Sequence, residues 1–271
     1  MSRCDTKYPI LLIHGMGARD RKRLSYWGRI PTALRKNGAK VFFGGQDSNG
    51  SLETNAKTLC GAVERVIAET GSEKLNIIAH SKGGLEARYM ISCHGLADRV
   101  ASLTTLSTPH HGSITMDYVM KLPKVLLKIG SAIADIWFRI LGDEEPDTYS
   151  CLELFTTACA ERFNANTPDA DGVYYQSYSF VMNKWYSDLA MAFSYMVVRF
   201  FEGENYGHLA PRATSWTNFR GIYRGAGARG VSHCQQVNLA RNRLNITDGE
   251  KIMDITEFYV NLAEELKESG F

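Results

Sequence analysis

The segment AHSKGG, residues 79–84, constrains this chain more than any other, because it stands between an apolar strand-like run and a helical pattern. Small residues two positions before and two after a serine permit a backbone turn at which larger side chains would collide with their neighbours. Such a turn lifts the Ser81 hydroxyl above a sheet edge and directs the amino terminus of the next helix toward a reacting carbonyl. The pentapeptide alone is a weak signal. Its strand-and-helix context favours a nucleophile at Ser81 over an ordinary turn serine.

The elements around this turn alternate between strand and helix. Apolar runs of strand character lie at Tyr8–Ile13, Val41–Phe43, Leu75–Ala79 and Val100–Leu106, and helical patterns lie at Tyr26–Lys36, Leu52–Thr70 and Gly84–Ser92. This alternation predicts an α/β fold, with a mostly parallel sheet and helices on both faces. We further expect strands at Val173–Val181 and Met196–Phe201 and a closing amphipathic helix at Ile255–Leu266. With neither a repeat nor a linker, residues 1–271 are predicted to form one domain.

Residues 113–165 interrupt the alternation with apolar helical segments at Val119–Ile129 and Ile133–Leu141. Their length and position after a sheet strand favour an inserted helical lid over Ser81, whose apolar face meets lipid when open. The side chains expected on that face are Val125, Leu126, Leu127, Trp137 and Phe138. The alternative is that these residues pack on the core, as most apolar helix stripes do.

A second glycine-rich turn, His14-Gly15-Met16-Gly17, follows the first expected strand. A tetrahedral oxyanion needs two backbone N–H donors already in place. We expect these donors to be the amides of Met16 and Lys82, the latter being the residue after the nucleophile. The competing interpretation of residues 14–17 is an ordinary turn between strand and helix.

The general base should be a histidine late in the chain, because this type of site orders its residues serine, acid, histidine. Of the seven histidines only His208 and His233 lie far enough downstream. His233 follows Gly230-Val231-Ser232 and precedes a polar helix start, so it is placed on a loop from which a base can reach the serine. A solvated loop histidine is the alternative.

The composition excludes several classes of protein. With 31 basic and 29 acidic residues the formal net charge is +2, so no nucleic-acid partner is expected, and no protein partner is implied. The first seven residues lack the apolar stretch of a signal peptide, which predicts a cytoplasmic protein or one whose leader has been removed. The six cysteines form no C-x-x-C pair, so we expect buried reduced thiols and no metal or other cofactor.

Several motifs together resemble those of a known family. YPILLIHGMG, AHSKGG, STPHHGS at Ser107–Ser113, GVYYQSYS, FEGENYGHLAP and GVSHCQQVN occur in the order found in the bacterial true lipases of the Pseudomonas and Burkholderia type and their clostridial relatives. The resemblance implies an α/β-hydrolase fold with a helical lid, acting on esters of glycerol or similar alcohols. By position, Ser81 matches the family's nucleophile, His233 its histidine, and Met16 and Lys82 its oxyanion amides.

Two positions depart from the family pattern. Tyr206 stands in Asn205-Tyr206-Gly207, where the family has the triad aspartate, and a tyrosine carries no negative charge near neutral pH. Glu204, two residues upstream, is the expected substitute acid, with Glu202 as a poorer one. Gln235 replaces an aspartate that is often a calcium ligand in this group, so we do not expect the ion.

Three functions follow from these residues. The favoured hypothesis is a lipase or carboxylesterase that works through a Ser81 acyl-enzyme. The second, motivated by Tyr206, is an impaired hydrolase that binds an acyl or other hydrophobic ligand without turnover. The third passes the acyl group to an alcohol other than water.

Overall fold

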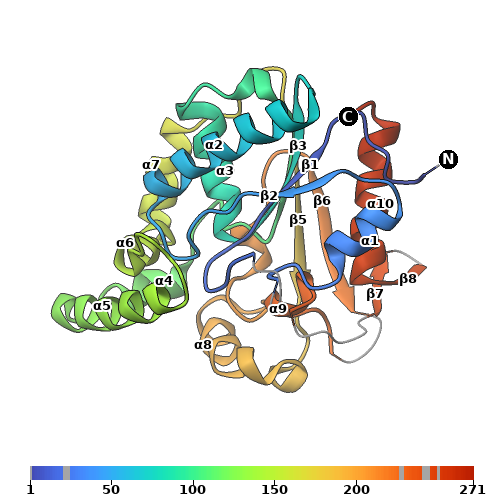
Figure 1. The fold of residues 1–271 in the computed structure, drawn as a ribbon. Coiled ribbons are helices and arrows are strands. Elements are labelled where there is room, and N and C mark those ends of the chain that lie inside the picture. Colours follow the sequence, from blue (N-terminus) through green and yellow to red (C-terminus); the bar gives the residue numbers. More distant parts are fainter. Residues whose placement is uncertain (1, 21–24, 226–228, 240–244, 249–250) are drawn as a thin grey trace.

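The computed structural model describes residues 2–20, 25–225, 229–239, 245–248 and 251–271. Its centre is an eight-stranded sheet of order β2-β1-β3-β4-β5-β6-β7-β8 (Figure 1). Strands β1 to β6 run parallel, and β7 and β8 add an antiparallel edge. The strands span β1 Ile10–Ile13, β2 Val41–Phe43, β3 Leu75–His80, β4 Val100–Leu106, β5 Tyr174–Val181, β6 Phe219–Gly225, β7 Asn245–Asp248 and β8 Lys251–Asp254.

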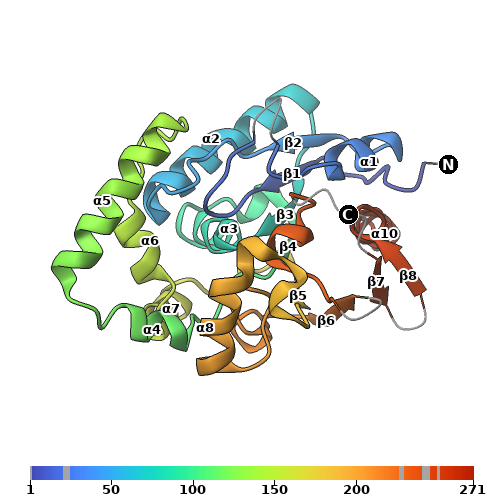
Figure 2. The ribbon, with the colours of Figure 1, turned by 90° about the horizontal axis from the view of Figure 1, so that it is seen from below.

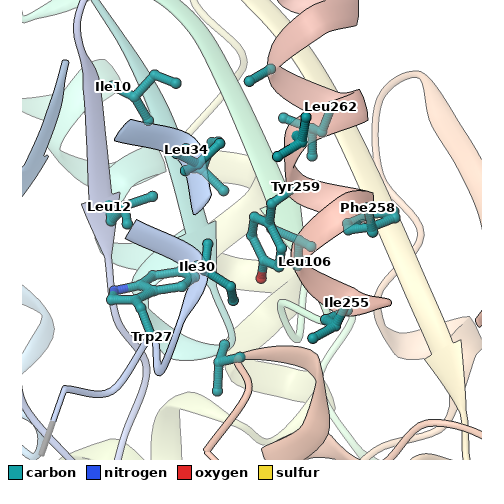
Figure 3. Packing of buried hydrophobic residues seen from close by; sticks show 14 of the residues in the cluster. Ile10, Leu12, Trp27, Ile30, Leu34, Leu106, Ile255, Phe258, Tyr259 and Leu262 are labelled. Carbon is teal, nitrogen blue, oxygen red and sulfur yellow. The ribbon is translucent and has the colours of Figure 1, made fainter. Parts of the chain in front are cut away.

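Helices cover both faces of this sheet, because its central strands are apolar on both sides. Ile10 and Leu12 of β1 pack with α1 (Ile30–Lys36) and α10 (Ile255–Glu268), in the cluster that Figure 3 shows. The intervening Leu11 and Ile13 join a second cluster with α2 (Leu52–Thr70) and α3 (Lys82–Cys93). This alternation is what a strand buried on two faces requires. The predicted α/β fold is confirmed.

The segment 113–165 forms four helices: α4 (Ile114–Val119), α5 (Lys124–Ile140), α6 (Thr148–Leu154) and α7 (Thr157–Asn166). The two predicted helices Val119–Ile129 and Ile133–Leu141 are in fact one, α5. Figure 2 shows α4, α5 and α6 together on one side of the molecule, with α8 (Ala192–Glu202) next to α4.

The outer face of α5 does not pack on the core. Val125, Leu126 and Trp137 are 67%, 62% and 58% exposed, so core packing is the wrong explanation for these three side chains. Phe138 points the other way and lines the central pocket. Of the five side chains expected on one face, Phe138 therefore lies inside, Leu127 is half-buried, and the other three lie outside.

Two predictions near the carboxyl end differ from the structure. The expected strand Met196–Phe201 is part of α8, in which the exposed Phe193, Met196 and Phe200 follow helical spacing. Strand β6 has no counterpart in the prediction, because its sequence FRGIYRG contains arginine and glycine rather than a continuous apolar run. The short remaining elements are α9 (His233–Gln236) and the 3₁₀ turns η1 (Ala97–Arg99), η2 (Trp185–Ser187), η3 (Leu189–Met191) and η4 (Pro211–Ala213).

All six cysteines are free thiols. Cys4 and Cys151 are buried, as expected, but Cys93 is exposed at the end of α3. The prediction of buried thiols is therefore wrong for Cys93.

Candidate active site

Ser81 occupies the sharp turn between β3 and α3. Its backbone lies at φ 56° and ψ −131°, a left-handed conformation that a non-glycine residue adopts only under constraint. The constraint is visible in the packing: a β-carbon on Gly83 would come within 2.4 Å of the His14 carbonyl oxygen. The Ser81 amide donates to the Leu106 carbonyl at 2.9 Å, which ties the turn to β4. The structure thus holds Ser81 as the sequence pattern predicts for a nucleophile elbow.

The glycine-rich turn after β1 lies directly against this serine. A β-carbon on Gly15 would approach the Ser81 Cβ to 2.7 Å, so only glycine allows the two turns to meet. The Gly17 amide donates to Asn49 Oδ1 at 3.3 Å, which fixes the far side of the turn. Met16, between these two glycines, lines the same pocket as Ser81. Lys82 is the first residue of α3, so no carbonyl lies four residues earlier in the helix to accept its amide hydrogen.

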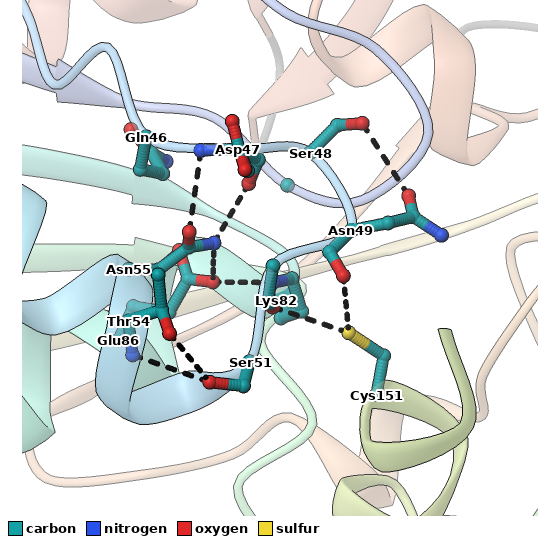
Figure 4. Close-up of polar contacts among 12 residues, drawn as sticks. Gln46, Asp47, Ser48, Asn49, Ser51, Thr54, Asn55, Lys82, Glu86 and Cys151 are labelled. Atoms are coloured by element: carbon teal, nitrogen blue, oxygen red, sulfur yellow. Dashed lines mark hydrogen bonds and ion pairs between the residues drawn. The ribbon is translucent and has the colours of Figure 1, made fainter. Parts of the chain in front are cut away.

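The Lys82 side chain anchors the same turn from behind (Figure 4). Fully buried, it donates to the Gly50 carbonyl at 2.7 Å and pairs with buried Glu86 at 2.5 Å. Asn55 donates to the same Glu86 carboxylate at 2.6 Å and to the Asp47 carbonyl at 2.7 Å. A buried ion pair needs such additional hydrogen bonds to offset the loss of hydration. The network joins α2, α3 and the loop after β2 beneath the two expected oxyanion amides.

His233 begins the short helix α9, and its main chain is well anchored. Ser232 caps α9 and accepts from the Gln235 amide, while the Gln235 side chain accepts from the Ser232 amide at 2.9 Å. Gln235, at the position where a calcium ligand would otherwise stand, is thereby used in the cap. The His233 amide donates to the Tyr206 carbonyl at 2.8 Å.

Ser81, His233 and Met16 meet in one pocket of about 360 Å³. Most of the remaining wall is apolar: Pro109, Met116, Phe138, Leu152, Phe155 and Leu209. A concave apolar site with a few convergent polar groups is the usual form of a small-molecule site. The structure therefore brings together four residues that the sequence singled out, Ser81, His233, Met16 and Lys82.

Tyr206 lies beneath the histidine where the triad acid would stand. Its ring stacks on that of His233, with centroids 5.4 Å apart and planes at 13°. Its hydroxyl donates to the Ser107 carbonyl at 3.1 Å, and burial raises the Tyr206 pKa well above its ordinary value. The tyrosine is therefore neutral, and its hydroxyl bonds the Ser107 carbonyl instead of His233, so it does not take the place of the triad acid.

The His233 ring consequently has an unusual environment. Its Nδ1 atom is buried and has no hydrogen-bond partner among the residues that the structure describes. Burial, and then the neighbouring imidazoles of His80 and His208, lower the His233 pKa well below its usual value. A base held by a carboxylate would show the opposite shift, because a negative charge favours the protonated ring.

The structure does not bring Glu204 to this histidine. The Glu204 carboxylate faces the surface, 46% exposed, and pairs with both terminal nitrogens of Arg224 at 2.5 and 2.9 Å. The chain turns at Gly203, between Glu202 and Glu204, and the buried side chain next to His233 is that of Tyr206. Glu202 is buried but bonds Ser113 and the Thr115 amide, where it holds the start of α4.

His208 is the pocket residue that the choice of His233 left aside. Its ring lies edge-on to His233 with centroids 4.9 Å apart, and it lines the pocket that contains Ser81. The sequence feature that points to His208 is its position two residues after Tyr206, in the loop that departs from the family pattern. No sequence signal points to Asp188, because it belongs to none of the motifs; its carboxylate accepts from Ser232 Oγ at 2.5 Å.

This chain combines a mostly parallel sheet with a strained serine between a strand and a helix. These are the features of α/β proteins that carry a nucleophile elbow. Residues 8–147, just over half of the chain, match the family described as "alpha/beta hydrolase fold". The chain belongs to the alpha/beta-hydrolase fold family, and the resemblance noted from its motifs is confirmed.

Individual relatives agree with this assignment. A triacylglycerol lipase of Pseudarthrobacter phenanthrenivorans is 32% identical over 61% of this chain and 55% of its own length. Triacylglycerol lipase 2 of Saccharomyces cerevisiae is 30% identical over 98% of this chain and 78% of its own. The chain spans about half the length of the Pseudarthrobacter and Burkholderia plantarii relatives, 55% and 49%.

Solved structures share the fold at lower identity. A metagenomic carboxyl esterase superposes with a TM-score of 0.73 at 13% identity, covering 97% of this chain and 76% of its own. Staphylococcus hyicus lipase superposes with a TM-score of 0.67 at 15% identity, covering 99% and 98%.

Proposed function

We propose that this protein is a serine hydrolase that cleaves carboxylic esters of lipid-like alcohols, as a lipase or carboxylesterase does. The observation that carries the proposal is Ser81, held in a left-handed turn at the floor of an apolar pocket that it shares with His233. The names of the relatives, triacylglycerol lipases and an esterase, point to the same chemistry. The constrained Ser81 and the names of the relatives together favour a hydrolase over a protein that only binds an acyl ligand.

The proposed reaction follows from the placement of the groups. Ser81 Oγ attacks the ester carbonyl carbon while an imidazole of the pocket accepts the hydroxyl proton, a role that the order of residues along the chain assigns to His233. The amides of Met16 and Lys82 hold the oxyanion, already oriented by the Gly17–Asn49 contact and the Lys82 network. The proton then passes to the departing alkoxide, and water releases the acyl group from Ser81.

Helices α4 to α7 are proposed as a lid, with α5 and α8 in contact with a lipid surface. Met116 of α4 and Phe138 of α5 line the pocket from the inside. Ile133 and Ile140 of α5 and Phe193 of α8 are 64%, 72% and 83% exposed, and large exposed apolar side chains that gather on one surface mark interaction sites. In the part of the chain that the structure describes, no helix is long and apolar enough to span a membrane.

The hydrolase assignment is tested with p-nitrophenyl esters of short and long acyl chains and with a fluorophosphonate probe that labels activated serines. We expect the wild type to turn over the esters and to be labelled. Ser81→Ala should lose at least about a thousandfold in kcat while keeping its circular dichroism spectrum. Turnover unchanged in Ser81→Ala would overturn the assignment. A wild type that is neither active nor labelled would identify a binding protein instead, and ester exchange with an added alcohol would identify transfer to an acceptor other than water.

The surface contact is tested with Ile133→Glu. A charge on the outer face of α5 should lower hydrolysis of an emulsified long-chain ester about tenfold while leaving a dissolved short-chain ester within twofold. The matched control is Ile222→Glu, which places the same charge on β6. Equal effects of Ile133→Glu on both substrates would contradict the proposed contact.

A further inference from the structure

In the described part of this site no carboxylate lies beside His233 to stabilise the positive charge that a protonated imidazole carries. When Ser81 loses its proton to an imidazole, that ring becomes positive, and a triad normally stabilises it with a carboxylate. Here the His233 Nδ1 is buried without an acceptor among the described residues, and Tyr206 is neutral. A positive charge on His233 would also face the rings of His80 at 4.5 Å and of His208 at 4.9 Å. His233 is therefore a poor place for the proton to rest.

His208 offers a second imidazole at the same reacting centre. It lines the pocket with Ser81, so a bound ester would meet both rings. The His208 side chain is exposed to solvent at the pocket. Partial loss of hydration where the ring packs lowers the His208 pKa, and the negative charge of Asp188 opposes this shift, which no carboxylate of the described residues does at His233. The ionisable groups that face His208 are His233 on α9, His80 at the end of β3, and Asp188 on the turn before η3.

Asp188 is built into the structure at this point. One carboxylate oxygen accepts from the Ala190 amide at 3.1 Å, and the other accepts from Ser232 Oγ at 2.5 Å, one residue before His233. The side chain is half-buried, so its charge is only partly screened by water. Gly207 packs on Met191 of η3, which brings the loop that carries His208 against the turn that carries Asp188.

We propose that His208 is a catalytic base of this site beside His233, with Asp188 as its counter-ion. This inference rests on the proposed Ser81 acyl-enzyme. As Ser81 Oγ bonds to the carbonyl carbon, its O–H bond breaks and the proton comes to rest on an imidazole nitrogen of His208. When the intermediate collapses, the bond to the alkoxide breaks and the same proton passes to the alkoxide oxygen. The acid of this site thus acts on a different histidine from the one that the sequence order indicates.

The test compares His208→Gln, His233→Gln and Asp188→Asn with His94→Gln, which alters an exposed histidine at the end of α3. We expect His208→Gln to lower kcat at least about a hundredfold, as loss of a general base does. In Asp188→Asn, His208 loses the favourable negative charge of its counter-ion. The His208 pKa therefore falls, and the acid limb of the pH–rate profile moves to lower pH. Ser232→Ala removes the hydrogen bond to Asp188 but keeps the carboxylate, so the acid limb should stay in place.

Two further readouts separate this inference from the hydrolase assignment itself. The His208 ring, followed by NMR titration, should have a lower pKa in Asp188→Asn than in the wild type, whether or not esters are cleaved. Labelling by the fluorophosphonate should be slower in His208→Gln. A wild type that is never labelled overturns the proposed function. Labelling and kcat in His208→Gln within threefold of His94→Gln, or an unchanged His208 titration in Asp188→Asn, overturns the second base alone.

Discussion

The two halves of the candidate site are built in different ways. On the nucleophile side, Ser81, Gly83 and Gly15 fit so closely that the glycines leave no room for a β-carbon, and a buried polar network supports Lys82. On the histidine side, the main chain is firmly capped, but the His233 ring has an unpartnered Nδ1 and lies on a tyrosine.

This difference separates two requirements of acyl transfer. The nucleophile and its oxyanion donors depend on backbone geometry, which tolerates almost no change. The support of the base depends on charge, which several arrangements of carboxylate and imidazole can supply. The site therefore keeps the rigid half and varies the electrostatic half.

Among the substitutions that probe this division, the largest effect is expected from Gly83→Ala on the nucleophile side. The added methyl would lie 2.4 Å from the His14 carbonyl oxygen and 2.8 Å from that of Ile13, so the elbow must shift. We expect at least about a hundredfold loss of kcat, because a displacement of about 1 Å is enough for such a loss. The measurement is p-nitrophenyl ester turnover together with the melting temperature.

Gly61→Ala is the matched control for this change. Gly61 lies in α2 with open space around its Cα, so alanine should leave kcat unchanged and stabilise the helix by about 0.5–1 kcal/mol. If both alanine variants kept wild-type kcat, the close fit at the elbow would not be a requirement of the reaction.

Tyr206→Asp should have the next largest effect, on the histidine side. A carboxylate beside His233 raises the pKa of that ring and favours its protonated form. We expect kcat to rise about tenfold and the acid limb of the pH–rate profile to move to higher pH. Removal of a fully buried aromatic ring should also lower the free energy of unfolding by about 3 kcal/mol.

Tyr206→Phe separates the ring from the charge. It keeps the stacking on His233 and removes only the hydrogen bond to the Ser107 carbonyl, so kcat should stay within threefold and stability should fall by about 1 kcal/mol. A Tyr206→Asp variant no faster than Tyr206→Phe would show that His233 gains nothing from an adjacent acid.

The third prediction concerns the buried histidines of the nucleophile side. Burial lowers the pKa of both His14 and His80 to about 4, so both rings are neutral in the folded protein. The unfolded chain binds their protons near pH 6.5, and stability is therefore lost as the pH falls from about 6.5 to 4. The loss should reach up to about 3 kcal/mol for each ring. Urea unfolding at a series of pH values measures it, and His80→Gln should show a shallower dependence; an equally steep one would contradict this cause.

The sequence predicts the rigid half of the site well and the variable half poorly, for a physical reason. Ser81, Met16 and Lys82 follow from local patterns, because an elbow and a glycine-rich turn impose their residue types over a few positions. The sequence favours Glu204 only through its short distance along the chain from Tyr206. In the fold, Gly203 and Tyr206 redirect that loop, and Asp188 comes from a separate segment to accept from Ser232 Oγ, one residue before His233. Such an encounter depends on tertiary packing and leaves no local pattern.

The helices show the same limit. Apolar spacing along one face predicts α2, and that face, with Leu59, Val63 and Val66, does pack on the sheet. The sequence predicts a strand at Met196–Phe201, but in α8 Met196 and Phe200 are 54% and 81% exposed while Val198 is buried. A rule that assumes burial of apolar residues fails where a helix presents them to the surroundings.

The smallest effect should come from Glu204→Gln, the acid that the sequence favoured. Glu204 pairs with Arg224 at the surface, and exposed ion pairs contribute about 0–1 kcal/mol. We expect kcat and the melting temperature to stay close to wild type, with kcat within twofold. Glu202→Gln is the matched comparison: its buried carboxylate holds Ser113 and the Thr115 amide, so stability should fall by about 1–3 kcal/mol. A collapse of turnover in Glu204→Gln alone would mean that the Glu204 loop rearranges to reach His233 when substrate binds. The difference between a rigid nucleophile side and a variable histidine side would then hold only for the free protein.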